Sequence, residues 1–276
     1  MADWGPWVGD PINHVGSVNN VIPGATAHTK GSWVSAASGT GRGEGLRIIP
    51  TYLQGNATAR TLLVDIGMGS PEETIISNLM LSPSSVNSTD NTSRTVAQSV
   101  YFPIQIPAGN ALKARAQSSM ASHNGLYFYA NRVSSGLPCV GSVVDTYGAD
   151  TANSRGTVLT APATDGGYGA WSQVSASCNR AKALLVAVGN GNQTWTTFSN
   201  QWYSVQIAVG PASSEQTIIS IEEAGGASSG TGTVSQMILG PYYVDIPAGS
   251  RISARVAKQY ASSSQRTIDV MLYGIR

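Results

Sequence analysis

The chain has 276 residues, of which 11% are charged and 41% hydrophobic, and its formal net charge is +1. Soluble domains usually carry roughly 25% charged residues, and small and hydroxyl-bearing residues fill the difference here. With almost no net charge, nothing favours a nucleic acid or an anionic membrane as a partner. No apolar run reaches the roughly 20 residues that span a bilayer, so we expect no membrane insertion.

Residues 1–15 show no hydrophobic periodicity, but they contain Trp4 and Trp7 around a Gly-Pro pair. They lack the basic start and apolar core of a secretory signal, so we expect synthesis in a cytoplasm without a signal peptide. Large amphipathic rings are common anchors of protein interfaces. We therefore interpret residues 1–15 as an arm that docks on a neighbouring subunit through Trp4 and Trp7. The alternative is a frayed tail.

An internal repeat organises the rest of the chain. Residues 106–109 and 246–249 both read Ile-Pro-Ala-Gly, with alternating apolar residues on either side of each copy. This alternation around a turn predicts a strand, a tight turn and a second strand, that is, a hairpin. A second echo links residues 72–77 with residues 215–220. The pattern predicts an all-β protein with two tandem antiparallel β-sandwich domains, jelly-roll-like, produced by an internal duplication.

We place the two copies at residues 16–136 and 156–276, with residues 137–155 as a linker. Trp33 and Trp171 open a strand at the same point of each copy, which favours a place in the core over a ligand platform. Cys139 and Cys178 have no counterparts in the other copy. Two free thiols are the expected state of such cysteines in a cytoplasm.

The usual arrangements of catalytic residues are missing from the sequence. The three histidines do not stand at metal-ligand spacing, and there is no Gly-x-Ser-x-Gly elbow or phosphate-binding loop. The pairs Glu72-Glu73 and Glu222-Glu223 are adjacent, so on a strand their side chains point to opposite faces. We expect a protein that is not an enzyme and has no metal or cofactor. A catalytic pair assembled from distant loops stays open.

Arg115 and Arg255 occupy matched positions, each between two alanine or valine residues. An arginine repeated in this way could bind a carboxylate of a neighbouring subunit or of a ligand. The alternative is an arginine that lies over its own sheet. Sugar binding would instead use exposed aromatic rings, for which the candidates are Tyr127, Tyr129, Trp195, Trp202 and Tyr273.

Three motifs carry a family resemblance. They are Thr-Lys-Gly-Ser-Trp at residues 29–33, Ser-Glu-Gln at residues 214–216, and the segment around Ile-Pro-Ala-Gly-Ser-Arg-Ile at residues 242–252. With these motifs the chain resembles a group of uncharacterised virion proteins of tailed bacteriophages, over most of residues 16–276. The first copy departs from the pattern, because Glu73 stands where the second has Gln216 and Asn-Ala-Leu replaces Ser-Arg-Ile after the turn.

The resemblance implies a surface or appendage protein of the virion, such as a head decoration, a vertex spike, a fibre base or a tail-tip element. It brings no catalytic residue. The expected partners are capsid or tail and neck subunits and further copies of the chain. Because three chains would present six near-equivalent domains, a trimer is favoured. The alternative function is a carbohydrate-binding adhesin, on a tail or head fibre, that attaches the particle to bacterial surface polysaccharide.

Overall fold

A computed structural model gives the fold of the chain. The described residues form sixteen strands and no helix, and every pairing between strands is antiparallel. The predicted all-β, antiparallel fold class is confirmed. Within these residues, no helix is long and apolar enough to cross a membrane. The structure describes residues 20–37, 42–53, 61–81, 99–121, 126–133, 139–189, 201–225, 237–259 and 266–276.

The first half contains two sheets. Its strands are β1 (Val34–Ala37), β2 (Gly45–Leu53), β3 (Leu62–Met68), β4 (Glu73–Leu81), β5 (Val100–Phe102), β6 (Leu112–Ser118) and β7 (Leu126–Val133). One sheet has the order β1-β6-β3-β4 and the other the order β5-β2-β7. Leu46 and Ile48 of β2 share one hydrophobic cluster with Ile66 of β3, so the two sheets pack face to face.

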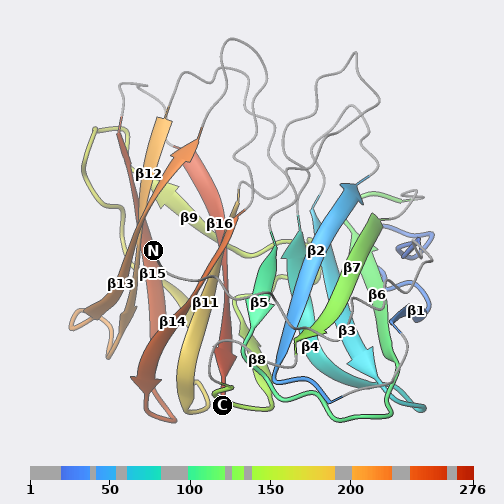
Figure 1. Cartoon of the computed structure of the whole chain (residues 1–276). Helices are drawn as coiled ribbons and strands as arrows, with labels where there is room; N and C mark the ends of the chain where they lie inside the picture. The colour runs from blue at the N-terminus through green and yellow to red at the C-terminus, as the bar shows by residue number, and fades with distance from the viewer. Residues whose placement is uncertain are drawn as a thin grey trace, which may run out of the picture.

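The second half also contains two sheets and lies beside the first (Figure 1). Its strands are β8 (Val144–Tyr147), β9 (Thr157–Ala161), β10 (Ser172–Ser175), β11 (Ala181–Gly189), β12 (Gln201–Val209), β13 (Gln216–Gly225), β14 (Met237–Ile246), β15 (Ile252–Gln259) and β16 (Arg266–Ile275). One sheet has the order β10-β15-β12-β13. The other has the order β14-β11-β16-β8, with β9 also paired to β16.

The two halves repeat each other strand by strand. The order β1-β6-β3-β4 corresponds to β10-β15-β12-β13, and β5-β2-β7 corresponds to β14-β11-β16. The register between β1 and β6 shifts after Ser35, and that between β10 and β15 shifts after Gln173. Ser35 and Gln173 occupy matched positions, so the register shift occurs at the same point in both halves. Agreement at an irregular point is what the predicted duplication would leave behind.

The Ile-Pro-Ala-Gly motifs do not form hairpins. Gly109 and Gly249 have φ values of 82° and 83°, as the turn requires. However, the strands on either side of each turn, β5 and β6 or β14 and β15, belong to different sheets. Each motif therefore carries the chain from one sheet of a sandwich to the other, and the prediction of a hairpin is wrong. Alternation shows that a strand is half-buried but not which strand it pairs with.

The segment predicted as a linker, residues 137–155, contains β8. This strand pairs with β16 and so extends a sheet of the second half. It also contacts the first half, where Thr146 Oγ1 donates a hydrogen bond to the carbonyl of Ser77 on β4 at 2.6 Å. The connection between the halves is therefore itself part of the packed structure, and β8 lies between them (Figure 1).

β16 is buried on both faces. Its residues Ile268, Val270 and Leu272 lie in the core of the second half, whereas Met271 and Tyr273 lie in the core cluster of the first half. Neighbouring residues on a strand project to opposite faces, so the sheet of the second half has one core on each side. The two halves thus share a packed hydrophobic interface.

Tyr273 joins the two halves by hydrogen bonds. Its hydroxyl accepts from the amide of Met80 at 2.7 Å and donates to the carbonyl of Asn78 at 3.2 Å. Its ring meets Phe102 edge-on, with the ring centroids 5.9 Å apart. β4 bulges here, because Asn78 has a φ of 54° and the register between β3 and β4 shifts beside it. The bulge opens β4 to the tyrosine hydroxyl.

The counterpart of β4, β13, presents a polar edge instead. Leu63 of β3 pairs with Met80, and the matching Ser204 of β12 pairs with Glu222. Glu222 therefore takes the place of Met80. Met80 is fully buried beside Tyr273, whereas Glu222 is exposed. The two halves use this position differently, one for contact with its neighbour and the other for contact with solvent.

Candidate functional site

Arg115 projects from β6 on the face opposite the buried alanines Ala114 and Ala116. Its Nε donates to Asp65 Oδ2 at 2.9 Å. Its guanidinium carbon lies 4.6 Å from the centroid of the Trp33 ring, within the range of a cation–π contact. The arginine therefore lies over its own sheet and is bound by residues of its own half.

Asp65 is buried and holds a second cation. Lys30 Nζ donates to Asp65 Oδ1 and to Asn78 Oδ1, both at 2.8 Å. The Asn78 amide also donates to Asp65 Oδ1, at 2.9 Å. Burial lowers the pKa of Lys30, and its hydrogen bond to Asp65 opposes this effect. Two cations share one carboxylate, which leaves the cluster with one positive charge.

Arg255 takes the matched position in the second half. Its Nε and Nη2 donate to Gln206 Oε1 at 2.8 and 2.7 Å. Its guanidinium carbon lies 4.2 Å from the ring centroid of Trp171 and 4.6 Å from that of Tyr168. Among the described residues, no carboxylate forms an ion pair with Arg255. The charge of this arginine is held by a neutral amide and two aromatic rings.

The cluster around Arg115 and the cluster around Arg255 have the same layout but are built from different residues. The acceptor is Asp65 in the first half and Gln206 in the second, and the residue three places before the tryptophan is Lys30 or Tyr168. The carboxylate occurs together with the lysine, and the amide occurs together with the tyrosine. Each cluster therefore keeps one net positive charge. Sequence reasoning missed these four partners, although the equal spacing of Lys30 and Tyr168 from the matched tryptophans was a usable signal.

Neither tryptophan lies in a core. Trp33 and Trp171 are partly exposed and stand outside both hydrophobic clusters. A Cβ atom on Gly67 would approach the Trp33 ring to 2.8 Å, so this ring packs against the backbone of β3. The prediction that both tryptophans lie in a core is wrong. Each ring lies on the outer face of its sheet, against the guanidinium of Arg115 or Arg255.

Replacing Asp65 by glutamine is expected to lower the free energy of unfolding by about 1–3 kcal/mol, because Lys30 and Arg115 lose their shared carboxylate. The effect is smaller than for a fully buried pair, since the two cationic side chains are 20% and 34% exposed. The double variant Lys30→Tyr/Asp65→Gln copies the second half and should regain more than half of the loss. Urea unfolding measures both values. A double variant no more stable than Asp65→Gln would contradict the coupling.

The acidic residues at the sheet edges are paired within the chain. Glu72 binds Lys113, and Glu215 binds Arg251 Nη1 at 2.9 Å. The hydrogen bond from Lys113 is the main cause that lowers the pKa of Glu72. Burial raises the pKa of Glu215, but hydrogen bonds from its own amide and from Arg251 outweigh this and lower it. Glu222 is exposed on β13. Glu72 and Glu215 therefore each link neighbouring segments at a sheet edge, whereas Glu222 forms no ion pair among the described residues.

A serine and a histidine meet at the junction of the halves. Ser154 Oγ lies 3.0 Å from His28 Nδ1 and accepts a hydrogen bond from Gln117 Nε2 at 2.9 Å. The pair has the spacing of a nucleophile and its base. Ser154 is nevertheless fully buried, so a substrate cannot reach its hydroxyl. The contact ties the loop after β8 to the first half.

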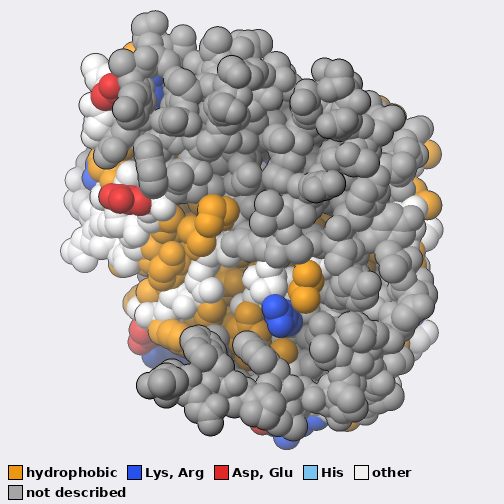
Figure 2. All heavy atoms as spheres, turned by 45° about the horizontal axis from the view of Figure 1, so that its top comes forward, with side chains coloured by type: hydrophobic (Ala, Val, Ile, Leu, Met, Phe, Trp, Pro, Cys, Tyr) orange, Lys and Arg blue, Asp and Glu red, His pale blue; other side chains and the backbone are white. Residues whose placement is uncertain are grey.

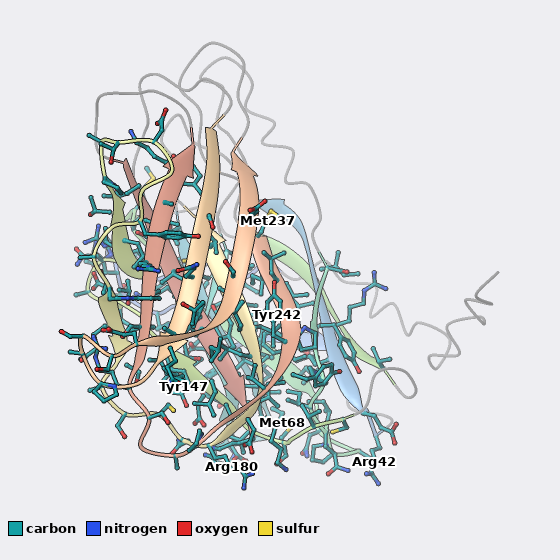
Figure 3. All side chains as sticks on the ribbon, turned by 90° about the vertical axis from the view of Figure 1, so that its left-hand side faces the viewer. Arg42, Met68, Tyr147, Arg180, Met237 and Tyr242 are labelled. Atoms are coloured by element: carbon teal, nitrogen blue, oxygen red, sulfur yellow. The ribbon has the colours of Figure 1, made fainter. Side chains whose placement is uncertain are left out.

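An aromatic surface borders the junction. Tyr243 of β14 is 53% exposed, and it lies close enough to the half-buried Tyr101 of β5 to affect the pKa of that phenol, which burial raises. Met237 and Tyr242 lie along β14 (Figure 3). Figure 2 shows hydrophobic side chains gathered on the face of the molecule that β14 borders.

Other predicted site residues divide into three groups. Tyr273 is buried between the halves and is no sugar platform. Cys139 is exposed and Cys178 buried, and both are free, as expected. In the described part of the chain, no group of three or more histidine, cysteine or acidic residues could hold a metal ion. Outside the described residues lie Trp4, Trp7 and Trp195 and the side chains of Tyr127, Tyr129 and Trp202.

Comparisons with known proteins give distant likenesses of fold. No protein-family model matches the chain, and no curated protein matches its sequence significantly. The structure of PNGF-II has a TM-score of 0.41 at 9% identity over 94% of this chain, which spans 65% of that protein's length. At TM-scores below 0.5 these likenesses carry no information on function.

Two further structures also match over most of this chain. The infectious bursal disease virus Gt strain structure matches with a TM-score of 0.26 and 14% identity, covering 94% of this chain and 74% of that one. The tandem CBM51 modules of Sp3GH98, the family 98 glycoside hydrolase from Streptococcus pneumoniae SP3-BS71, match with a TM-score of 0.25 and 10% identity, covering 92% and 83%.

Proposed function

We propose that this protein is a non-enzymatic structural component of a virus particle of the tailed-bacteriophage type, a head decoration, vertex spike or fibre base that assembles as a symmetric oligomer. The observation that supports the proposal best is the shared core of the two halves, in which β16 has Leu272 in one cluster and Tyr273 in the other. A block with two similar halves at a fixed separation suits attachment to a symmetric scaffold.

The ion pairs support a structural role as well. Lys113–Glu72, Arg251–Glu215 and Arg180–Asp245 each join neighbouring segments of a sheet surface. Their charges stabilise strand edges and do not converge around a substrate. The exposed ring of Tyr243 on β14 is a suitable anchor for a neighbouring subunit, since aromatic rings with one wet edge are common at interfaces.

Immunogold electron microscopy of purified particles, with antibody to this protein, tests the proposal. Gold over the head would identify a decoration or vertex spike. Gold over the tail or neck would identify a connector or fibre role. Particles free of gold, in a lysate that contains the protein, would overturn the virion assignment.

A second candidate function is the binding of an acidic saccharide on a bacterial surface. Arg255 favours it, because this arginine has no carboxylate partner among the described residues and stands between Tyr168 and Trp171. In the first half the matched Arg115 already binds Asp65. A free carboxylate could meet Arg255 at the guanidinium edge that Gln206 does not use.

Binding to an immobilised uronic-acid polysaccharide is expected to fall at least tenfold in the Arg255→Ala variant, because the charge-assisted contact is lost. Arg115→Ala is the matched control and should bind like the unmodified protein. Surface plasmon resonance measures both, after thermal melting has shown that the variants are folded. Equal losses in the two variants, or no binding by the unmodified protein, would remove the adhesin candidate.

A further inference from the structure

The cluster around Asp65 contains the three groups of an amide-forming reaction. The amine Nζ of Lys30 lies 2.8 Å from Asp65 Oδ1 and 2.8 Å from Asn78 Oδ1. Because Asn78 Cγ is bonded to that Oδ1, a small movement brings Nζ to the distance of about 3–3.5 Å from which a nucleophile attacks a carbonyl carbon. A nucleophile, a carboxamide carbon and a carboxylate that can carry protons therefore meet at one point of the first half.

The surroundings of Lys30 favour the neutral amine that attack requires. Burial is the main cause that lowers the pKa of Lys30, and the charge of Arg115 adds to this effect, whereas Asp65 opposes it. Arg115 Nε binds Asp65 Oδ2 at 2.9 Å, so the other carboxylate oxygen, Oδ1, faces the amine. Because Asp65 is buried, the neutral amine and carboxylic acid are easier to reach from the ion pair than they would be in water.

Asn78 is the extra residue of the bulge in β4. Residues 72–77 match residues 215–220. Leu79 then matches Ile221, because each lies opposite one of two matched valines on the neighbouring strand. Asn78 is left without a counterpart, and its φ of 54° is that of an inserted residue. A bulge changes the direction of a side chain, and here the Asn78 carboxamide reaches the amine of Lys30.

The three groups occur together in the first half and are all absent from the matched place in the second. There the lysine is replaced by Tyr168 and the acid by Gln206, and no residue corresponds to Asn78. An ion pair between a lysine and a carboxylate needs no inserted asparagine beside it. The insertion of the carboxamide at the very point where the other two groups meet therefore indicates a task that all three share.

We propose that Lys30 and Asn78 react to form an isopeptide bond within the chain, with Asp65 as the catalytic residue. Asp65 Oδ1 takes a proton from the ammonium, and the lone pair of Nζ then forms a C–N bond to Asn78 Cγ. Asp65 passes a proton to Asn78 Nδ2, the Cγ–Nδ2 bond breaks and ammonia leaves. Of the three Nζ protons, one stays on the new amide and two depart with the Nδ2 group as an ammonium ion. Charge is conserved, nothing is oxidised or reduced, and Asp65 ends as the carboxylate it was.

The bond clamps the first half across its sheet. Lys30 precedes β1 and Asn78 lies on β4, and β1 and β4 are the two edges of the sheet β1-β6-β3-β4. The carbonyl of Asn78 also accepts the hydrogen bond from Tyr273 at 3.2 Å. The bond thus fixes a residue on which the two halves meet. The stability changes expected for the Asp65→Gln variants concern chains without this bond.

Intact-mass spectrometry of the purified full-length protein tests the reaction. The unmodified chain is expected to weigh less than its sequence by one ammonia, about 17 Da, and its digest should contain a branched peptide that joins Lys30 to Asn78. Lys30→Arg keeps the charge beside Asp65 but provides no nucleophile, and Asp65→Asn keeps the shape but cannot carry the proton. Both variants should have their full mass. Lys113→Arg changes a lysine paired with Glu72; it is the matched control and should lose ammonia like the unmodified chain.

Three outcomes would overturn the proposal. A folded unmodified chain of full mass would show that the bond does not form. Loss of ammonia that persists in Lys30→Arg would place the reaction at another amide, and loss that persists in Asp65→Asn would remove this carboxylate from the reaction. Thermal melting checks that each variant is folded. Asn78→Gly suits the positive φ and gives a further variant that should keep its full mass. None of these masses depends on whether the protein belongs to a virion.

Discussion

Replacing Tyr273 by alanine is expected to lower the free energy of unfolding by about 3–5 kcal/mol, the usual cost of removing a buried aromatic ring. The ring is fully buried between the halves, and its loss removes the hydrogen bond to the Met80 amide and the edge-on contact with Phe102. Chemical denaturation followed by tryptophan fluorescence measures the change. Because the contact joins the two halves, we expect the single transition to broaden or split.

Two variants separate the parts of this effect. Tyr273→Phe keeps the ring but removes the hydroxyl, and should cost about 1–3 kcal/mol because the buried hydrogen bonds to the Met80 amide and the Asn78 carbonyl are lost. Tyr243→Ala removes an exposed tyrosine and should change stability by less than about 0.5 kcal/mol. If Tyr273→Ala were as mild as Tyr243→Ala, the shared core would not hold the halves together.

Stability is expected to fall as the pH rises from about 4 to 7, through Asp269. This carboxyl is buried on β16, one of its oxygens has no hydrogen-bond partner, and burial raises its pKa to about 7. The nearby charge of Arg155 and the Gly156 amide oppose the rise, and Asp150 adds to it. Between the two pKa values the folded state holds a proton that the unfolded state has lost, so unfolding becomes easier as the pH rises.

A pKa raised from 3.8 to about 7 corresponds to about 4 kcal/mol of stability lost across this range, and the loss is complete above pH 7. Asp269→Asn cannot ionise and should flatten this part of the profile, whatever its absolute stability. Asp245→Asn changes an exposed carboxylate paired with Arg180 and serves as the control. Urea unfolding at pH 4 to 8 gives the slopes. A slope shared by the unmodified protein and Asp269→Asn would exclude this carboxyl as its source.

The fold class could be predicted from the sequence because it rests on local signals. Alternation in residues such as Leu62, Val64 and Ile66 shows strands, and their recurrence as Tyr203, Val205 and Ile207 shows the repeat. Strand partners could not be predicted, since the same alternation fits either sheet of a sandwich. The continuous apolar stretch of β16 did contain a sign of the shared core, because a strand buried on both faces has no polar side.

The candidate site could be predicted only in part. Matched positions identified Arg115 and Arg255, and the structure shows that both lie over their own sheets. Their partners Asp65 and Gln206 differ between the halves, so a search for identical residues passes over them. The contact of Tyr273 with β4 depends on a bulge in only one half, and a repeat analysis has no signal for a feature that is not repeated.

The contact between the halves, made beside the bulge of β4, also bears on whether chains could stack end to end. The contact between the halves is heterologous, since it joins unlike surfaces of two like units, and contacts of this kind build open fibres when they are repeated from chain to chain. β13 is where the next chain would have to add, and it carries Glu222 at the position of Met80. Continuing the stack would bury an unpaired carboxylate. We therefore expect chains not to stack through β13, so that higher assembly would use other surfaces.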